Sequence, residues 1–152
     1  MLDFSNHYNA TIDDKGRIVL PSAYKKKMVE SSERIVFVEL DPIFECLNLY
    51  PPSSWEERVR TVKARLNPND PRQSRLLDRF FQGFVEITIS ENGRLNIPNT
   101  FYQRKGIVKN AVFSGQGDRV RLWDTGRFQA HSMTDEEFSA DFAAMMGGNI
   151  DP

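Results

Sequence analysis

Two arginines, each following a glycine in a short polar turn, are the residues best suited to chemistry. The first turn covers residues 13–17 (DDKGR) and the second covers residues 90–94 (SENGR). An arginine held in one orientation can form the paired hydrogen bonds that recognise guanine O6 and N7, or a phosphate. Asp13 can accept N–H bonds of the first turn or hold the Arg17 guanidinium in place. Lys15, at the tip, adds a point charge suited to a phosphate backbone.

Other interpretations of the basic residues stay open. On spacing alone, each turn is also compatible with a surface hairpin whose arginine pairs with a nearby acid. The cluster Lys25–Lys27 predicts a solvated helix face when taken by itself. A stripe of three arginines (Arg72, Arg75, Arg79) could meet phosphate, the acids of a neighbouring subunit, or water, and we favour solvation or a subunit contact.

Residues suited to catalysis are scarce, so we predict that the protein is not an enzyme and has no cofactor or metal. His7 and His131 are far apart and lack spaced partners. Cys46, the only cysteine, sits in an apolar segment and is predicted to be a small buried hydrophobe. The sequence contains no P-loop, nucleophile elbow or dinucleotide-binding glycine pattern.

Length and composition favour one compact unit. The chain has 152 residues, 39% hydrophobic and 27% charged, which is typical of one domain or of two small halves sharing a core. It has no apolar run of 18 residues and no recognisable secretory signal, so we expect a cytoplasmic protein without a membrane span.

The charge is unevenly distributed. The net charge of −1 would by itself argue against a polyanionic partner. Residues 1–134, however, carry all 20 Lys and Arg against 16 acids, whereas residues 135–152 carry five acids and no base. We expect a mildly basic body and an acidic tail, which forms a helix near residues 136–145 and then frays. The tail serves solubility or, less simply, screens the basic body.

An internal repeat organises the chain. Residues 12–24 (IDDKGRIVLPSAY) match residues 89–101 (ISENGRLNIPNTF) at a constant offset of 77, and residues 47–55 match residues 120–128 at an offset of 73. Each half is predicted to form ββαββ followed by a helix. Such halves are too small for separate cores, so we expect them to pack around a pseudo-two-fold axis, with the two turns side by side.

The expected elements follow from the repeat. Gly16 and Gly93 can adopt positive φ and close a hairpin between the first two strands of each half. The expected strands are 8–13, 17–20, 34–40 and 46–50 in the first half, and 84–89, 94–97, 110–114 and 119–123 in the second. Between the halves we expect a helix opened by a Ser53–Glu56 capping box, with an apolar stripe through Leu66, and a second helix over 72–82. A shorter helix over 125–133 is the counterpart of the first.

The doubled motif, DDKGRIVLP and ENGRLNIP, together with LNLYPPSSWEERV and its echo VRLWD, resembles the MraZ family of bacterial transcription regulators. The resemblance covers about residues 8–133. It implies an α+β, β-rich fold of two AbrB-like swapped hairpins forming a double-split β-barrel. It also implies a non-enzymatic, nucleoid-associated protein that assembles into an octamer-like ring. Such proteins bind direct repeats in double-stranded DNA, upstream of the division and cell-wall gene cluster, most simply as repressors.

The family signature is an aspartate followed four residues later by an arginine, once per half. Asp13 and Arg17 match it, whereas Ser90 replaces the second aspartate and Asn92 occupies the second tip. The resemblance therefore implies that the first turn reads DNA more strongly. The DNA-binding residues implied are Asp13, Lys15, Gly16, Arg17, Gly93 and Arg94.

The expected organisation has four parts. Residues 8–60 form the first repeat, 61–83 a helical connector, 84–134 the second repeat and 135–152 the acidic tail. The alternative function is an antitoxin-like interaction module of the same superfamily. In that case the tail, with Phe138, Phe142, Met145 and Met146, would bind a partner protein.

Overall fold

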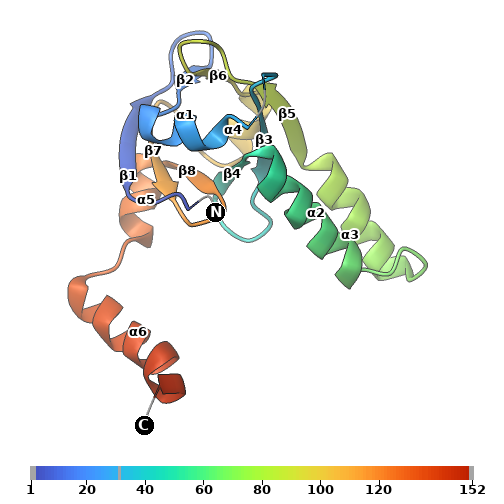
Figure 1. Cartoon of the computed structure of the whole chain (residues 1–152), viewed down its shortest axis with the longest axis vertical. Helices are drawn as coiled ribbons and strands as arrows, with labels where there is room; N and C mark the ends of the chain where they lie inside the picture. The colour runs from blue at the N-terminus through green and yellow to red at the C-terminus, as the bar shows by residue number, and fades with distance from the viewer. Residues whose placement is uncertain (1–2, 31, 151–152) are drawn as a thin grey trace.

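The computed structural model describes residues 3–30 and 32–150, and it shows the predicted doubling element by element (Figure 1). The elements of the first half are β1 (His7–Thr11), β2 (Arg17–Val19), α1 (Ser22–Met28), β3 (Ile35–Leu40), β4 (Cys46–Tyr50) and α2 (Pro52–Arg65). Helix α3 (Pro71–Gln82) connects the halves. The second half contains β5 (Phe84–Thr88), β6 (Arg94–Asn96), α4 (Asn99–Arg104), β7 (Asn110–Gly115), β8 (Val120–Asp124) and α5 (Thr125–His131), and α6 (Asp135–Ile150) follows.

The two halves exchange strands. The larger sheet has the antiparallel order β1-β7-β8-β4-β3-β5, so β1 of the first half pairs with β7 of the second, and β5 pairs with β3. Corresponding strands lie at equal distances from the β8–β4 junction, which places the predicted pseudo-two-fold axis there. This arrangement confirms an α+β protein with two tandem halves and antiparallel sheets. Closure of the sheets into a barrel stays a prediction.

A second, two-stranded sheet crosses the same axis. Strands β2 and β6 pair antiparallel, with Ile18 opposite Leu95 at the centre. Both side chains are buried, whereas Val19 and Arg94 point to the other side. Alternation along these short strands therefore directs one face into the shared core and leaves the other exposed. The core is continuous across the halves, as expected for units too small to fold alone.

The predicted hairpins are wrong in one respect. Gly16 and Gly93 do close tight turns at φ +81° and +82°, but the strands on either side of each turn do not pair with each other. Strand β1 continues to β7, while β2 continues to β6. Pairing with the other half satisfies the backbone groups of both strands, which a local ladder of three residues would do poorly.

The two faces of the larger sheet differ. One face contributes alternate residues such as Val38, Leu49 and Leu122 to the core. The opposite face carries the intervening residues and is covered by the last helix of each half, α2 or α5 (Figure 1). Trp55 of α2 stacks there on Phe37 with ring centroids 5.6 Å apart, and also on Phe80 of α3 at 5.7 Å. These ring contacts attach the α2–α3 pair to the sheet.

The predicted capping box of α2 is also wrong. The helix begins at Pro52, and its N-cap residue is Pro51, which makes no side-chain capping hydrogen bond. Ser53 instead donates both its N–H and its hydroxyl to the Glu30 carboxylate, which lies just after α1. An acid from a neighbouring segment thus satisfies an N–H group that Glu56 was expected to cap.

Helix α6 is longer than predicted and stands apart from the body. It starts at Asp135 and runs through both glycines to Ile150, five residues past the expected end. The remaining residues of the predicted frayed end, 151–152, lie outside the described residues. Figure 1 shows α6 at the opposite end of the molecule from the β2 and β6 turns. This position does not favour screening of a subunit's turns by its own tail.

Candidate nucleic-acid interface

The first turn holds its arginine with a single aspartate. Asp13 Oδ1 accepts the backbone N–H groups of Lys15 and Arg17, at 2.9 and 2.8 Å. Its other oxygen, Oδ2, accepts the Arg17 Nε–H at 2.9 Å. These contacts, the Arg17 backbone N–H first, hold the pKa of Asp13 below its usual value. Among the described residues only Nε of Arg17 has a side-chain partner, so its two terminal nitrogens are available to a ligand.

The second turn keeps the backbone pattern but lacks the charge. Ser90 Oγ accepts the Arg94 backbone N–H at 2.8 Å, as Asp13 does for Arg17. The same hydroxyl donates to the Asn92 side-chain oxygen. Within the described part of the chain, the Arg94 guanidinium has no hydrogen-bond or ion-pair partner. Serine therefore shapes the turn without orienting its arginine.

Each turn is also fastened by the opposite half. The buried Tyr102 of α4 donates its hydroxyl to the Gly16 carbonyl at 3.2 Å. At the corresponding position of the first half, Lys25 of α1 donates its ammonium to the Glu91 carbonyl. Burial raises the pKa of the Tyr102 hydroxyl, which remains a donor at neutral pH. Sequence reasoning missed both anchors, although the offset of 77 that relates Lys25 to Tyr102 was visible in the repeat.

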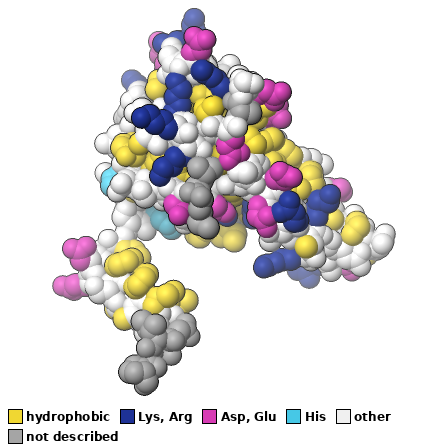
Figure 2. Space-filling model, viewed as in Figure 1, with side chains coloured by type: hydrophobic (Ala, Val, Ile, Leu, Met, Phe, Trp, Pro, Cys, Tyr) yellow, Lys and Arg dark blue, Asp and Glu magenta, His cyan; other side chains and the backbone are white. Residues whose placement is uncertain are grey.

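The two arginines share one surface. Because β2 pairs with β6, Arg17 lies opposite Asn96, and Arg94 lies opposite Val19. Arg17 and Arg94 both line an open hollow of about 570 Å³, together with Ser90 and Asn92 of the second turn. Figure 2 shows basic side chains over this end of the molecule, intermixed with acidic ones. The structure therefore brings the predicted arginines together.

The other predicted basic residues lie elsewhere or have partners. In the Lys25–Lys27 cluster, Lys25 fastens the second turn and Lys27 donates to the Asp3 carbonyl at 2.8 Å. The arginine stripe of α3 is exposed on the arm that α2 and α3 form, away from the turns (Figure 1). These arginines are therefore not part of the two-arginine surface.

The remaining candidates for chemistry are packed as structural groups. His7 lies 5.2 Å from the Phe128 ring, and His131 stacks on Trp123 at 4.5 Å. Cys46 is fully buried, and burial raises the pKa of its thiol to about 12. Among the described residues, no group of His, Cys, Asp and Glu side chains could hold a metal ion, and no helix could cross a membrane.

A buried polar network between the inner strands β3 and β4 was not predicted. The Asn48 amide donates to Glu39 at 3.0 Å and to Asp41 at 2.9 Å, and Arg58 donates to Glu39 at 2.8 Å. Burial alone would raise the pKa of Asp41. Its hydrogen bonds from the Phe44 N–H, the Asn48 amide and the Ile43 N–H, with the Arg121 charge, outweigh that effect and lower the pKa. The network joins the sheet to α2, so we assign it to stability.

Comparison with known proteins finds one family that matches the chain twice, once in each half. Two successive segments, residues 4–79 and 80–149, match the family described as "MraZ protein, putative antitoxin-like". The chain belongs to the MraZ family. It is 36% identical over 131 residues to the transcriptional regulator MraZ of Stenotrophomonas maltophilia, covering 84% of each chain. It is 31% identical to that of Lachnoclostridium phytofermentans, covering 95% of this chain and 97% of the relative.

A third MraZ relative, from Bacteroides thetaiotaomicron, is 28% identical over 96% of this chain and 94% of its own. Membership of the MraZ family confirms the resemblance predicted from the repeated turns. MraZ is a non-enzymatic family, and the prediction that this chain is not an enzyme agrees with it.

Proposed function

We propose that this MraZ-family protein is a transcription regulator that binds double-stranded DNA sequence-specifically through its paired turns. The observation that supports the proposal most is the shared hollow lined by Arg17 and Arg94. The proposed contact residues are Asp13, Lys15, Gly16, Arg17, Gly93 and Arg94. Arg17 reads a base edge in the major groove, Lys15 meets phosphate, and the glycines give the turns their shape.

The acidic partner of Arg17 supports base reading rather than simple attraction to phosphate. A guanidinium already held at Nε enters the groove with less freedom to lose, which favours a fixed hydrogen-bond geometry. Ser90 provides no such hold for Arg94, so the first turn contributes more to binding. Tyr102 and Lys25 keep the backbone of the two turns in place during the contact.

One subunit offers few contacts, so assembly supplies the affinity. We propose that several copies form an octamer-like ring and engage successive direct repeats on one DNA, which raises avidity through effective concentration. If each subunit neutralises about two phosphates, log K falls with log salt by roughly 0.9 per phosphate. A salt slope that does not grow with the number of repeats would contradict simultaneous engagement.

The proposed setting follows from the family. The repeats lie upstream of the division and cell-wall gene cluster, and occupied repeats repress transcription by excluding polymerase. The protein then works in the cytoplasm, on the nucleoid. Its parts are two swapped-hairpin repeats, residues 8–60 and 84–134, joined by a connector over 61–83 and followed by the tail from 135, the sheets closing as a double-split barrel.

A gel shift tests the DNA-binding proposal. The probe is the DNA upstream of the gene that encodes this chain, and the proteins are wild type, Arg17→Ala and Arg72→Ala. Arg72→Ala is the control, because Arg72 is exposed on α3 and does not line the hollow. We expect the repeats to be shifted by wild type and by the control, but weakly by Arg17→Ala. Equal shifts by all three proteins would show that Arg17 of the first turn does not contribute to DNA binding.

An antitoxin-like interaction module is the second candidate function. Helix α6 exposes Phe138 and Phe142, which are half exposed and stacked on each other at 5.1 Å. Capture of a small basic toxin protein that depends on residues 134–152 would favour this candidate. Repeat-specific DNA binding without such a partner would favour the regulator.

A further inference from the structure

Helix α6 has the composition of a docking helix. It carries four acids and no base, with Phe138, Phe142 and Met146 exposed along one side. Asp141 follows Phe138 by three residues, so a carboxylate and an aromatic ring are neighbours on the helix surface. Figure 2 shows hydrophobic and acidic side chains on this helix, which stands away from the body.

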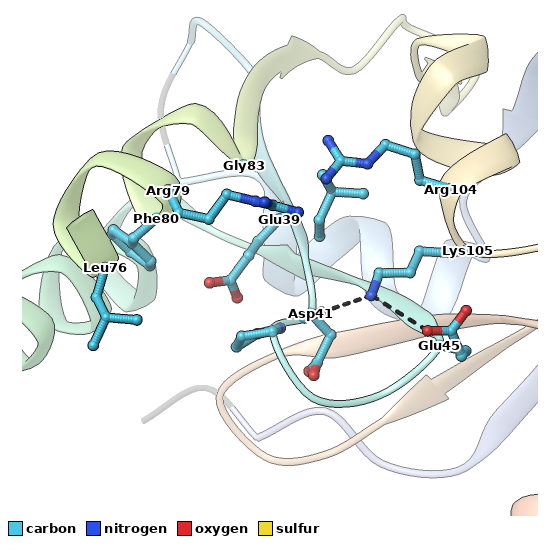
Figure 3. Close-up of a pocket in the computed structure, with 11 residues that line it drawn as sticks. Glu39, Asp41, Glu45, Leu76, Arg79, Phe80, Gly83, Arg104 and Lys105 are labelled. Carbon is cyan, nitrogen blue, oxygen red and sulfur yellow. Dashed lines mark hydrogen bonds and ion pairs between the residues drawn. The ribbon is translucent and has the colours of Figure 1, made fainter. Parts of the chain in front are cut away.

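A hollow beside α3 has the complementary composition. Its volume is about 540 Å³, and α3, α4 and the β3–β4 loop border it. Leu76 and Phe80 of α3 supply apolar surface, and Leu76 is 52% exposed. Arg79 of α3 and Arg104 of α4 extend into the hollow from opposite sides (Figure 3).

The positive charges of Arg79 and Arg104 are not neutralised within the hollow. Within the described residues, neither the Arg79 nor the Arg104 guanidinium has a hydrogen-bond or ion-pair partner. The acids that line the hollow are already engaged. Glu39 pairs with Arg58 at 2.8 Å, Asp41 pairs with Arg121 at 3.5 Å, and Glu45 lies 4.0 Å from the Lys105 ammonium. An anionic partner with apolar side chains therefore fits this surface.

We infer that α6 of one subunit docks into the α3–α4 hollow of a second copy of this chain. Phe138 packs on Leu76 and Phe80, while Asp141 faces Arg79. The inference rests on the proposed assembly, for which it supplies the contact. It also gives Arg79, one member of the α3 arginine stripe, a role as a subunit contact.

The geometry favours a second copy over the subunit's own tail. Three residues, 132–134, separate α5 from α6, and they extend at most about 11 Å. Figure 1 shows α6 and α3 on opposite sides of the body. A contact between two different surfaces is heterologous, and its repetition closes a ring when the rotation permits. One tail and one hollow per subunit suffice for every contact in such a ring.

Charge reversal tests the contact in the full-length protein. We expect Arg79→Glu and Asp141→Arg each to weaken assembly about tenfold or more in dissociation constant, as measured by light scattering after gel filtration. The double variant, which restores opposite charges, recovers much of the assembly. The matched control is Arg72→Glu, on the same helix but outside the hollow, and it keeps the wild-type mass.

The apolar part of the contact has its own variant. Phe138→Ala with Phe142→Ala shifts the mass toward a single 17.5 kDa subunit, whereas Val108→Ala, at an 83% exposed site outside both surfaces, does not. Far-ultraviolet circular dichroism checks that every variant is folded. Wild-type mass in the charge reversals and in the double alanine variant overturns the inference, as does a wild type that stays a single subunit at all concentrations.

The outcomes separate the contact from the DNA-binding proposal. If the tail variants stay assembled while Arg17→Ala loses binding to the direct repeats, the contact is wrong and the DNA interface stands. If the tail variants dissociate but no variant shows repeat-specific DNA binding, the contact stands and the DNA interface is wrong. A basic protein partner bound through α6, with assembly unchanged by the variants, overturns the contact and favours the antitoxin-like module.

Discussion

Loss of Arg17 is predicted to weaken DNA binding more than loss of Arg94, although both arginines line one hollow. The difference between the turns is Asp13, which holds the Arg17 Nε at 2.9 Å, against Ser90, which contacts only the Arg94 backbone. The perturbation is a pair of single substitutions, Arg17→Ala and Arg94→Ala.

The expected size follows from these contacts. A bidentate contact to a base is worth about 1–3 kcal/mol, which is about 5- to 150-fold in affinity per engaged subunit. Ordering a long side chain at an interface costs about 0.5–1.5 kcal/mol. Arg94 bears that cost on binding, whereas Arg17 is already oriented. Arg17→Ala should therefore lose about 2- to 12-fold more affinity than Arg94→Ala.

Fluorescence anisotropy with a short duplex that carries one repeat measures this difference without the amplification that several engaged subunits would add. All proteins are compared at one salt concentration, because phosphate contacts make affinity depend strongly on salt. Arg72→Ala serves as the control for the loss of one positive charge outside the hollow.

A further variant tests whether the orientation of Arg17 by Asp13 causes the difference between the two arginines. Asp13→Asn keeps an oxygen for the backbone N–H groups but removes the charge that holds the guanidinium. We expect it to bring the contribution of Arg17 down to that of Arg94. Equal losses for Arg17→Ala and Arg94→Ala, or tighter binding by Asp13→Asn to repeat and scrambled DNA alike, would refute the reasoning.

Three further predictions concern the framework. Gly93→Ala should lower the free energy of unfolding by about 1–2 kcal/mol in urea titrations, because φ is +82° and a Cβ at that φ is strained. Gly16→Ala, at a φ of +81°, should cost a similar amount, and no loss at either position would contradict this account. Asp41→Ala should cost about 3–5 kcal/mol because it leaves the Arg121 side chain, which is only 12% exposed, without its acid, and a loss below about 1 kcal/mol would contradict that role. The pKa of Asp41 is lowered in the folded state, so the ionised Asp41 stabilises the fold fully above the unfolded pKa of about 3.9. This stabilisation is lost as the pH falls further. Between pH 5 and pH 2, the urea midpoint of wild type should therefore drop more than that of Asp41→Ala. Cys46 should react with a thiol reagent only after unfolding, because its side chain is fully buried. Rapid labelling of the native protein would show that the thiol is accessible in the folded state.

The repeat made the fold largely predictable. The constant offsets placed all eight strands to within two residues at each end, because alternating apolar residues and the Gly-Arg turns recur in both halves. The strand exchange was implied by the family resemblance but did not follow from the turns themselves. A glycine turn between two strand-like segments is normally a local hairpin, and only pairing across the halves, as between β2 and β6, shows that the strands separate.

Contacts distant in sequence account for most of what the sequence did not predict. The capping box at Ser53 failed because Glu30, 23 residues earlier, occupies the same N–H group. Tyr102 fastens the Gly16 carbonyl across 86 residues, which no local pattern indicates. The side chains of the candidate site itself were predictable, because Asp13 and Arg17 interact within one turn.

The most direct test of the central claim is competition between repeat DNA and scrambled DNA of the same length for the assembled protein at fixed salt. If the paired turns read sequence, the protein prefers the repeats by about 10³-fold or more. The variant that combines Arg17→Ala with Arg94→Ala then loses most of that preference while keeping its assembly. Equal affinity of the wild-type protein for repeat and scrambled DNA would contradict the account.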